Sequence, residues 1–225
     1  MTTLKTRPAS LSNSWEDVKK HAKPLAFALL ATLAMSVIDF IVYFIVSMIF
    51  TALFGGEYSD FGALFGAVFG HVASLPIYIV ACMSGMLVAI IPALYFESGE
   101  VVSFSSAVAK IRDNFMRYLL AGIFFNVMAT VGFLFCILPG IAISLTLPVY
   151  VNKIFNTNLS ILEAFSASFS AVFKDQGWSF VGIQIVGSIA VGFVGVCTCL
   201  FGLLIAVPMY TFYMQNLAYN KGLVS

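Results

Sequence analysis

The chain has 225 residues, of which 61% are hydrophobic and only 9% are charged, and its net charge is +1. A soluble domain typically contains about 25% charged residues, so a chain of this size could not bury its apolar side chains and keep a water-soluble exterior. The composition therefore excludes a soluble globular domain and predicts an integral membrane protein. Spanning segments must be helices or a closed barrel, because hydrocarbon offers no partner for backbone groups, and the long apolar runs without alternation favour helices.

Residues 1–23 are polar and contain no apolar core of a secretory signal, so we expect the first apolar run to be a true span. The third and fourth apolar blocks, 118–156 and 178–220, are about twice the roughly 20 residues that one span needs. Each predicts a hairpin, with turns at Pro139-Gly140 and near 199–202. The result is six transmembrane helices, over 25–48, 73–95, 118–137, 140–157, 179–199 and 201–219.

The distribution of charge gives the orientation of these six helices. All 11 Lys and Arg residues fall on one side of the six-span arrangement, and the loops on the other side carry only Glu57 and Asp60. Because basic residues are retained in cytoplasmic loops, both termini are predicted to lie in the cytoplasm.

Two segments of the chain, 145–156 and 205–216, read LTLPVYVNKIFN and IAVPMYTFYMQN. Three pairs of residues match between them: Pro148 with Pro208, Tyr150 with Tyr210, and Asn156 with Asn216. The match extends backwards, where 103–117 aligns with 160–174. We therefore predict a single polytopic domain over 1–225 built from three parallel repeats, each an interfacial amphipathic helix followed by a helical hairpin, at about 12–97, 101–157 and 158–220.

The segments that begin these repeats have the spacing of amphipathic helices. Apolar side chains recur on one face of each: Phe104, Val108, Ile111 and Phe115 in one, and Leu162, Phe165, Phe169 and Phe173 in the other. Ser160 and Glu163 form a capping box, which Ser14 and Asp17 repeat loosely. We expect these helices to lie along the cytoplasmic interface, where Lys110, Arg112 and Arg117 would contact lipid head groups.

The segment FLFCILPGIAISLTLPVYVNKIFNTNLSILEAFSASFSAVFKDQGWSF, residues 133–180, carries a family resemblance. Its Pro139-Gly140 pair, the Ala164 and Ser168 helix and Trp178 resemble the membrane domain of some bacterial glycerophosphodiester phosphodiesterases and of related six-span bacterial inner-membrane proteins. An acidic residue common before the Ala-Ser helix is replaced by 156–158, and no counterpart of the soluble phosphodiesterase domain is present. The resemblance therefore implies a fold and a bacterial inner membrane, and no activity.

Asp39 lies in the middle of the first predicted span. A carboxylate at this depth costs several kcal/mol unless it is paired or neutral. Tyr43, Asn126, Gln184 and His71 are the potential partners. Two interpretations stay open: a protonated carboxyl that locks helices together through one hydrogen bond, or part of an ion or proton pathway.

Small residues recur every fourth position just before the second predicted span, at Gly62, Gly66, Gly70 and Ser74. Such a face lets two helix backbones approach closely. We expect helix packing within the monomer, with a seam between copies or a ligand groove as alternatives. The sequence leaves open whether this stretch extends the second span or lies on the outer surface.

Four cysteines fall in the predicted spans, at Cys82, Cys136, Cys197 and Cys199. We expect buried, inert thiols, although Cys136 could reach Cys197 or Cys199 for a disulfide in an oxidising periplasm. The two histidines are far apart in depth and no ligand spacing recurs, so no metal site is expected. No nucleotide-binding or hydrolase motif is present either, so we expect neither a cofactor nor an enzyme.

Two functional hypotheses follow. The first is a non-enzymatic, lipid-interacting or membrane-organising accessory module, with membrane lipids, and a second copy or another membrane protein, as partners. The second is a transporter or channel for a small or amphiphilic molecule, with Asp39 in the pathway. Nucleic acid is not expected as a partner, because membrane topology accounts for the basic residues.

Overall fold

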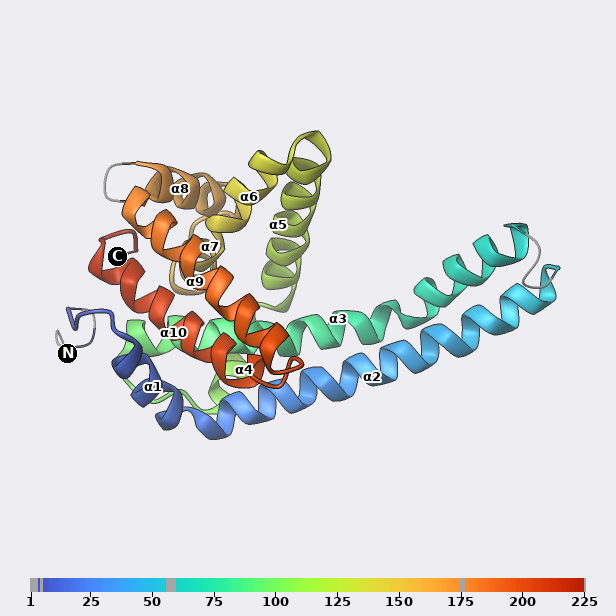
Figure 1. The fold of residues 1–225 in the computed structure, drawn as a ribbon, viewed down its shortest axis with the longest axis horizontal. Coiled ribbons are helices and arrows are strands. Elements are labelled where there is room, and N and C mark those ends of the chain that lie inside the picture. The colour runs from blue at the N-terminus through green and yellow to red at the C-terminus, as the bar shows by residue number, and fades with distance from the viewer. Residues whose placement is uncertain (1–3, 5, 56–59, 175–176, 225) are drawn as a thin grey trace. The chain divides into compact units, whose positions relative to one another are not determined.

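The computed structural model describes residue 4 and residues 6–55, 60–174 and 177–224. Within these residues the protein is all-helical, as predicted (Figure 1). Lys5 and Glu57, both used to predict the orientation, lie outside the described residues. The helices are α1 (Leu11–Lys20), α2 (Ala22–Leu53), α3 (Asp60–Ser98), α4 (Phe104–Asp113), α5 (Phe115–Phe135), α6 (Ile137–Leu145), α7 (Leu147–Asn156), α8 (Ile161–Phe173), α9 (Gly177–Cys197) and α10 (Leu203–Asn220).

Four of the described helices, α2, α3, α5 and α9, are long and apolar enough to cross a membrane. The α6–α7 pair is bent by 43° and adds a fifth if it forms one span. The helix α10 matches the predicted sixth span, but Pro208 interrupts it and Gln215 and Asn216 are buried in it. Six spans therefore remain a prediction.

The chain divides into two compact units, unit 1 (Met1–Leu25 and Leu87–Ser225) and unit 2 (Ala26–Met86). Unit 2 is a hairpin of most of α2 and the first part of α3, and the end of α3 belongs to unit 1 (Figure 1). All four small residues predicted to share a face are buried in α3. A Cβ atom added to Gly70 would lie 2.9 Å from the Tyr43 ring, and one added to Gly66 would meet Thr51 and the Ser47 carbonyl oxygen. The glycines thus let α3 approach α2 closely, and the stretch belongs to the same helix as the second predicted span.

Unit 1 is built around α10, which packs against α1, α7 and α9, while α8 packs against α5, α7 and α9. Phe96, Phe180 and Phe212 are its largest fully buried side chains. The turn between α9 and α10 lies where it was predicted, with Cys199 and Leu200 at φ values of 48° and 73°.

The turn predicted at Pro139-Gly140 lies elsewhere, because the chain reverses at the extended residue Cys136. Pro139 and Gly140 instead form the first turn of α6, where the missing proline N–H is not needed by the helix. Gly140 packs against the Phe133 ring, and a Cβ atom on Gly132 would lie 3.0 Å from the Gly140 Cα. The pair therefore serves the close packing of α5 and α6.

The short helices differ in part from their predicted form. The capping box of α8 is confirmed: the Ser160 N–H donates to Glu163 at 2.8 Å, and this bond lowers the pKa of Glu163. The cap of α1 is Ser10, so the Ser14 box is wrong, and Ser14 is buried instead. In α8 the buried residues are Ala164, Ser168 and Val172. Of the predicted apolar stripe, Leu162 and Phe169 are exposed, whereas the Phe165 ring packs against Phe125 and Tyr150.

The glycine face of α3 gives a test of unit 2. Gly66→Ala should destabilise the protein by about 1–3 kcal/mol, because the added methyl group overpacks the contact with α2. The control is Gly182→Ala in α9, where an added Cβ atom meets nothing within 4 Å. Thermal unfolding in detergent should show a lower melting temperature for the first variant only. Equal melting temperatures would contradict the close approach of α2 and α3.

Candidate functional site

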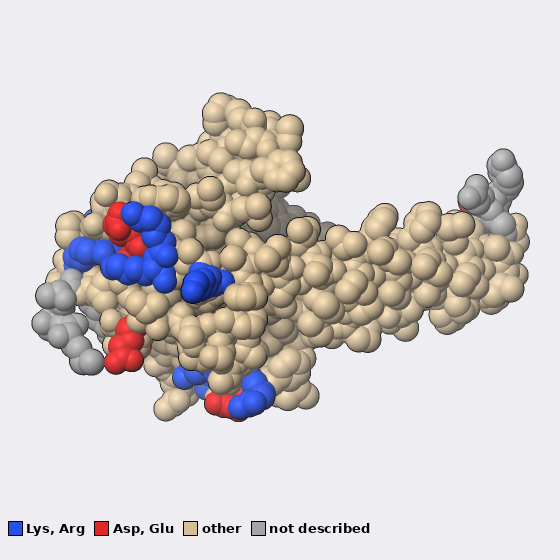
Figure 2. Space-filling model, turned by 90° about the horizontal axis from the view of Figure 1, so that it is seen from below, with Lys and Arg blue, Asp and Glu red and all other residues tan. Residues whose placement is uncertain are grey.

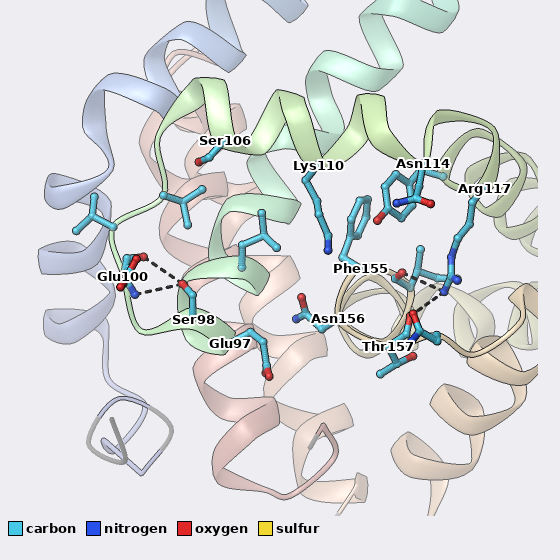
Figure 3. Close-up of a pocket in the computed structure, with 16 residues that line it drawn as sticks. Glu97, Ser98, Glu100, Ser106, Lys110, Asn114, Arg117, Phe155, Asn156 and Thr157 are labelled. Carbon is cyan, nitrogen blue, oxygen red and sulfur yellow. Dashed lines mark hydrogen bonds between the residues drawn. The ribbon is translucent and has the colours of Figure 1, made fainter.

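A cleft of about 480 Å³ opens in unit 1, which we call the polar cleft (Figure 3). It lies between the end of α3, the loop that follows it, α4, the start of α5 and the end of α7. Its polar lining residues are Glu97, Ser98, Glu100, Ser106, Lys110, Asn114, Arg117, Asn156, Thr157 and Asn158. Acidic and basic side chains therefore line one concave surface.

Lys110 is the basic side chain that reaches into this cleft (Figure 3). Ala107 and Ile111 hold α4 against the protein, and Lys110 extends from the same helix and is half-buried. Among the described residues, no hydrogen bond or ion pair reaches its ammonium group. A cation without a partner in a concave site attracts an anionic group of a ligand.

Unlike Lys110, Arg117 forms hydrogen bonds with the backbone of the protein. Its Nη2 atom donates to the carbonyl oxygens of Ile154 at 3.3 Å, Thr157 at 2.9 Å and Leu159 at 2.8 Å. These carbonyls lie at and beyond the C-terminal end of α7, where the helix offers no partner and its dipole favours a cation. Arg117 therefore closes the end of α7 and fixes one wall of the polar cleft (Figure 3).

Arg112 completes the set of predicted head-group contacts. It is exposed, and its Nε atom lies 3.8 Å from the carboxylate of Asp113. Of the three basic residues singled out from the sequence, two therefore line the polar cleft and Lys110 keeps a charge that no described residue neutralises.

A buried hydrogen-bond chain supports the acidic wall of the polar cleft. The Tyr219 hydroxyl donates to Glu97 at 2.8 Å, and the Asn152 amide donates to the Tyr219 oxygen and to Gln215, both at 3.1 Å. Gln215 in turn donates to the Pro148 carbonyl oxygen at 2.8 Å. None of these residues was singled out from the sequence, where the available signal was the amide side chains inside apolar runs.

A second buried cluster holds the loop before α4. Asp17 is fully buried, forms an ion pair with Arg7 and accepts a hydrogen bond from the Tyr95 hydroxyl at 3.1 Å. The Nε2 atom of His21 accepts a hydrogen bond from the Val102 N–H at 3.1 Å. This bond requires the neutral ring with its proton on Nδ1, which lies 2.8 Å from the Asp17 carbonyl oxygen. Because Val102 lines the polar cleft, His21 fixes part of its wall.

The predicted intramembrane polar residues do not form one described cluster. Asp39 belongs to unit 2, where its Oδ1 atom is buried without a hydrogen-bond partner among the described residues. The rings of Tyr43 and His71, also in unit 2, are in contact, tilted by 39° with their centroids 4.6 Å apart. In unit 1, Asn126 is exposed and donates to the Gly122 carbonyl of its own helix at 2.9 Å. Gln184, also in unit 1, is buried and its Oε1 atom has no partner among the described residues.

All four cysteines are free and exposed on the protein surface, so the expectation of buried thiols is wrong. Cys82 lies on α3 and Cys197 ends α9, while Cys136 and Cys199 lie in the connections that follow α5 and α9. The long apolar helices turn much of their surface outward, as helices that face lipid do. Among the described residues, no group of His, Cys, Asp and Glu is arranged to hold a metal ion.

No protein-family model matches the chain, and neither a curated protein nor a solved structure matches it. The fold and the cleft define a class, a helical protein with four or five candidate membrane spans and a polar cleft of mixed charge. The resemblance to phosphodiesterase membrane domains stays a prediction.

Acidification should loosen the wall of the polar cleft at Val102. Burial lowers the pKa of His21 from 6.5, against the opposing influence of Asp17. The unfolded chain therefore binds this proton more readily than the folded protein. The free energy of unfolding should be highest above about pH 6.5 and should fall as the pH drops through that lowered pKa.

Thermal unfolding measured from about pH 8 to about pH 5 checks this expectation. The melting temperature should fall on acidification in the native protein, and His21→Gln should flatten that profile because glutamine does not titrate. Asp17, Lys20 and Tyr95 surround His21 and remain in the variant. An unchanged profile in His21→Gln would assign the pH dependence to one of those groups.

Proposed function

We propose that this chain is a non-enzymatic, multi-pass protein of the bacterial inner membrane that binds lipid head groups in the polar cleft, as an accessory or membrane-organising module. The observation that carries the proposal is Lys110, a cation that no described residue neutralises, in a concave polar site of a chain that is otherwise strongly apolar. Phosphate groups of lipids are the anions that such a site would meet at a membrane surface.

The distribution of charge supports this placement. No Lys or Arg occurs between Lys23 and Lys110. On the face shown in Figure 2, charged side chains of unit 1 gather in a few groups of mixed sign, while the surface of unit 2 is almost entirely uncharged. Uncharged surface is what contacts hydrocarbon, and the charged groups suit the head-group region. In this proposal both termini lie in the cytoplasm.

The order of elements supports three parallel repeats and six spans. The short helices α1, α4 and α8 each precede two long segments, which are α2 and α3, then α5 and the bent α6–α7 pair, then α9 and α10. The matched tyrosines make similar bonds: Tyr150 donates to the Ala121 carbonyl and Tyr210 to the Gln184 carbonyl, both at 3.1 Å. In each case the closing helix of a hairpin is tied to the opening one.

The outward stripes of the short helices support an interfacial position. Leu162 and Phe169 on α8, and Val108 on α4, are exposed although they are apolar. An amphipathic helix at the interface buries such a face in the acyl boundary. The polar cleft beside α4 would then open at the depth of the head groups.

Removal of Lys110 tests the proposal. Lys110→Ala should reduce the lipid retained by the purified protein about tenfold, the effect of losing one charge-assisted hydrogen bond of roughly 1.5 kcal/mol. Native mass spectrometry in detergent measures the retained lipid. The matched control is Lys19→Ala, which removes an exposed lysine of α1 that pairs with Glu16 at 2.6 Å. Equal losses in both variants would contradict a head-group site in the cleft.

The buried and unpartnered Oδ1 atom of Asp39 favours a second candidate, a transporter or channel with this residue in its pathway. Under the first proposal Asp39→Asn should leave lipid retention and the melting temperature unchanged, because a carboxyl group and an amide are nearly isosteric. Flux of protons or small cations into proteoliposomes that disappears in Asp39→Asn, at an unchanged melting temperature, would instead establish the transporter.

A further inference from the structure

A further cavity, of about 520 Å³, lies in unit 1 between α8 and the turn that follows α10 (Figure 1), and we call it the basic pocket. One wall is a single face of α8, formed by Ala167, Ser170, Ala171 and Lys174. Their i, i+3, i+4, i+7 spacing places these four residues on the same side of the helix. The other wall is 221–223. None of these residues lines the polar cleft, so the two sites are separate.

Lys174 and Lys221 give the basic pocket its charge. Among the described residues that line it, none is acidic. No described residue forms a hydrogen bond or an ion pair with either ammonium group. Two cations contributed to one concave surface by different elements attract an anionic group of a ligand.

The turn after α10 is held by its backbone. Gly222 has a φ value of 65°, the left-handed conformation that glycine adopts just past the end of a helix. Its N–H donates to the carbonyl oxygen of Tyr219 at 3.0 Å. The N–H of Leu223, whose side chain is buried, donates to the carbonyl oxygen of Ala218 at 2.9 Å. Because backbone donors satisfy these carbonyls, the Lys221 ammonium group is not needed to cap α10.

The predicted repeats give the basic pocket a counterpart in the polar cleft. On the alignment of 103–117 with 160–174, three residues of the pocket match three of the cleft: Ala167 with Lys110, Ala171 with Asn114, and Lys174 with Arg117. Arg117 donates to three carbonyl oxygens, whereas no described residue accepts a hydrogen bond from Lys174. The cation at this position in the third predicted copy is therefore available to a ligand.

We propose that the basic pocket binds the phosphate of a phospholipid whose head group contains no cation, that is, a lipid of net negative charge. Lys174 and Lys221 contact the phosphate, since lysine binds phosphate as a compact point charge. Ser170 adds a hydroxyl donor to the same surface. A head-group ammonium would meet both lysines as a like charge, which disfavours zwitterionic lipids. This site goes beyond the proposed function, because its charge does not depend on Lys110.

The surroundings of the basic pocket favour a lipid over a free phosphate ion. Ala167, Ala171 and Leu223 give its lining apolar surface, and the Phe169 side chain on α8 is exposed. A phosphate ion gains nothing from apolar surface, whereas an acyl chain is stabilised by contact with it. Basic pockets between membrane helices on the cytoplasmic side suit anionic head groups.

Binding of phosphatidylglycerol to the full-length protein, followed by native mass spectrometry, tests the assignment. Lys174→Ala combined with Lys221→Ala should lower the affinity about tenfold, the effect of losing one charge-assisted hydrogen bond. The affinity for phosphatidylcholine with identical acyl chains should fall less. Replacing both lysines by arginine keeps the charge and should retain binding. An unchanged affinity for phosphatidylglycerol in the double alanine variant would overturn the proposal.

Two further variants separate a specific site from general attraction. Lys19→Ala combined with Lys23→Ala removes the same number of charges from exposed positions and should leave the affinity unchanged. An equal loss in this control would assign the binding to net charge and overturn the pocket. Ala171→Leu fills the pocket without changing its charge, and should lower the affinity at an unchanged melting temperature. Binding as tight as that of the native protein would place the phosphate elsewhere.

The outcomes distinguish this site from the polar cleft. If the double alanine variant loses phosphatidylglycerol while Lys110→Ala retains all lipid, the basic pocket stands and the proposed function of the cleft fails. The reverse result overturns the basic pocket and leaves the cleft as the lipid site. Soluble glycerol phosphate, which lacks acyl chains, should compete weakly; competition as strong as that of the lipid would overturn the lipid as the source of the phosphate.

Discussion

Backbone groups without a partner in their own helix must be satisfied inside this protein, because apolar surroundings offer no water. Pro92 lacks an N–H and so leaves the Val88 carbonyl without its intrahelical donor. The Thr211 hydroxyl lies 3.4 Å from that oxygen and 2.9 Å from the Pro208 carbonyl oxygen, so α10 places a hydroxyl group beside the carbonyl that α3 leaves open. Other bonds of this kind link helices of unit 1: the Tyr150 hydroxyl donates to the Ala121 carbonyl oxygen, and the Asn156 amide donates to the Ala93 carbonyl oxygen.

The polar cleft is a consequence of the same constraint. Arg117 is held by carbonyls at the end of α7, and Asn152 with Gln215 links α7 to α10. The polar groups of these side chains are therefore already used in hydrogen bonds within the protein, and these bonds hold the walls of the cleft in place. No described residue forms a hydrogen bond or ion pair with the Lys110 ammonium group, so its charge is available to a ligand.

Local features were predictable from the sequence and long-range ones were not. The Ser160 capping box and the turn near 199–202 depend on residues within a few positions of each other, and both are confirmed. The Pro139-Gly140 turn was placed wrongly because proline fits the first turn of a helix as well as a loop. Asp17 was mistaken for part of a cap because its partner Tyr95 is 78 residues away. The acidic wall of the cleft was missed for the same reason.

The predicted repeats give a reason to locate function in the polar cleft. On the alignment of 103–117 with 160–174, Lys110 corresponds to Ala167, so the third predicted copy lacks this cation. The matched asparagines have also diverged: Asn156 lines the cleft, whereas Asn216 is buried and lies 3.5 Å from the Pro8 carbonyl oxygen. Features that the predicted copies need for packing should be shared, as the bonds of Tyr150 and Tyr210 are between the second and third copies. Because Lys110 is absent from the third predicted copy, packing that the copies share does not explain it, whereas the proposed ligand binding does.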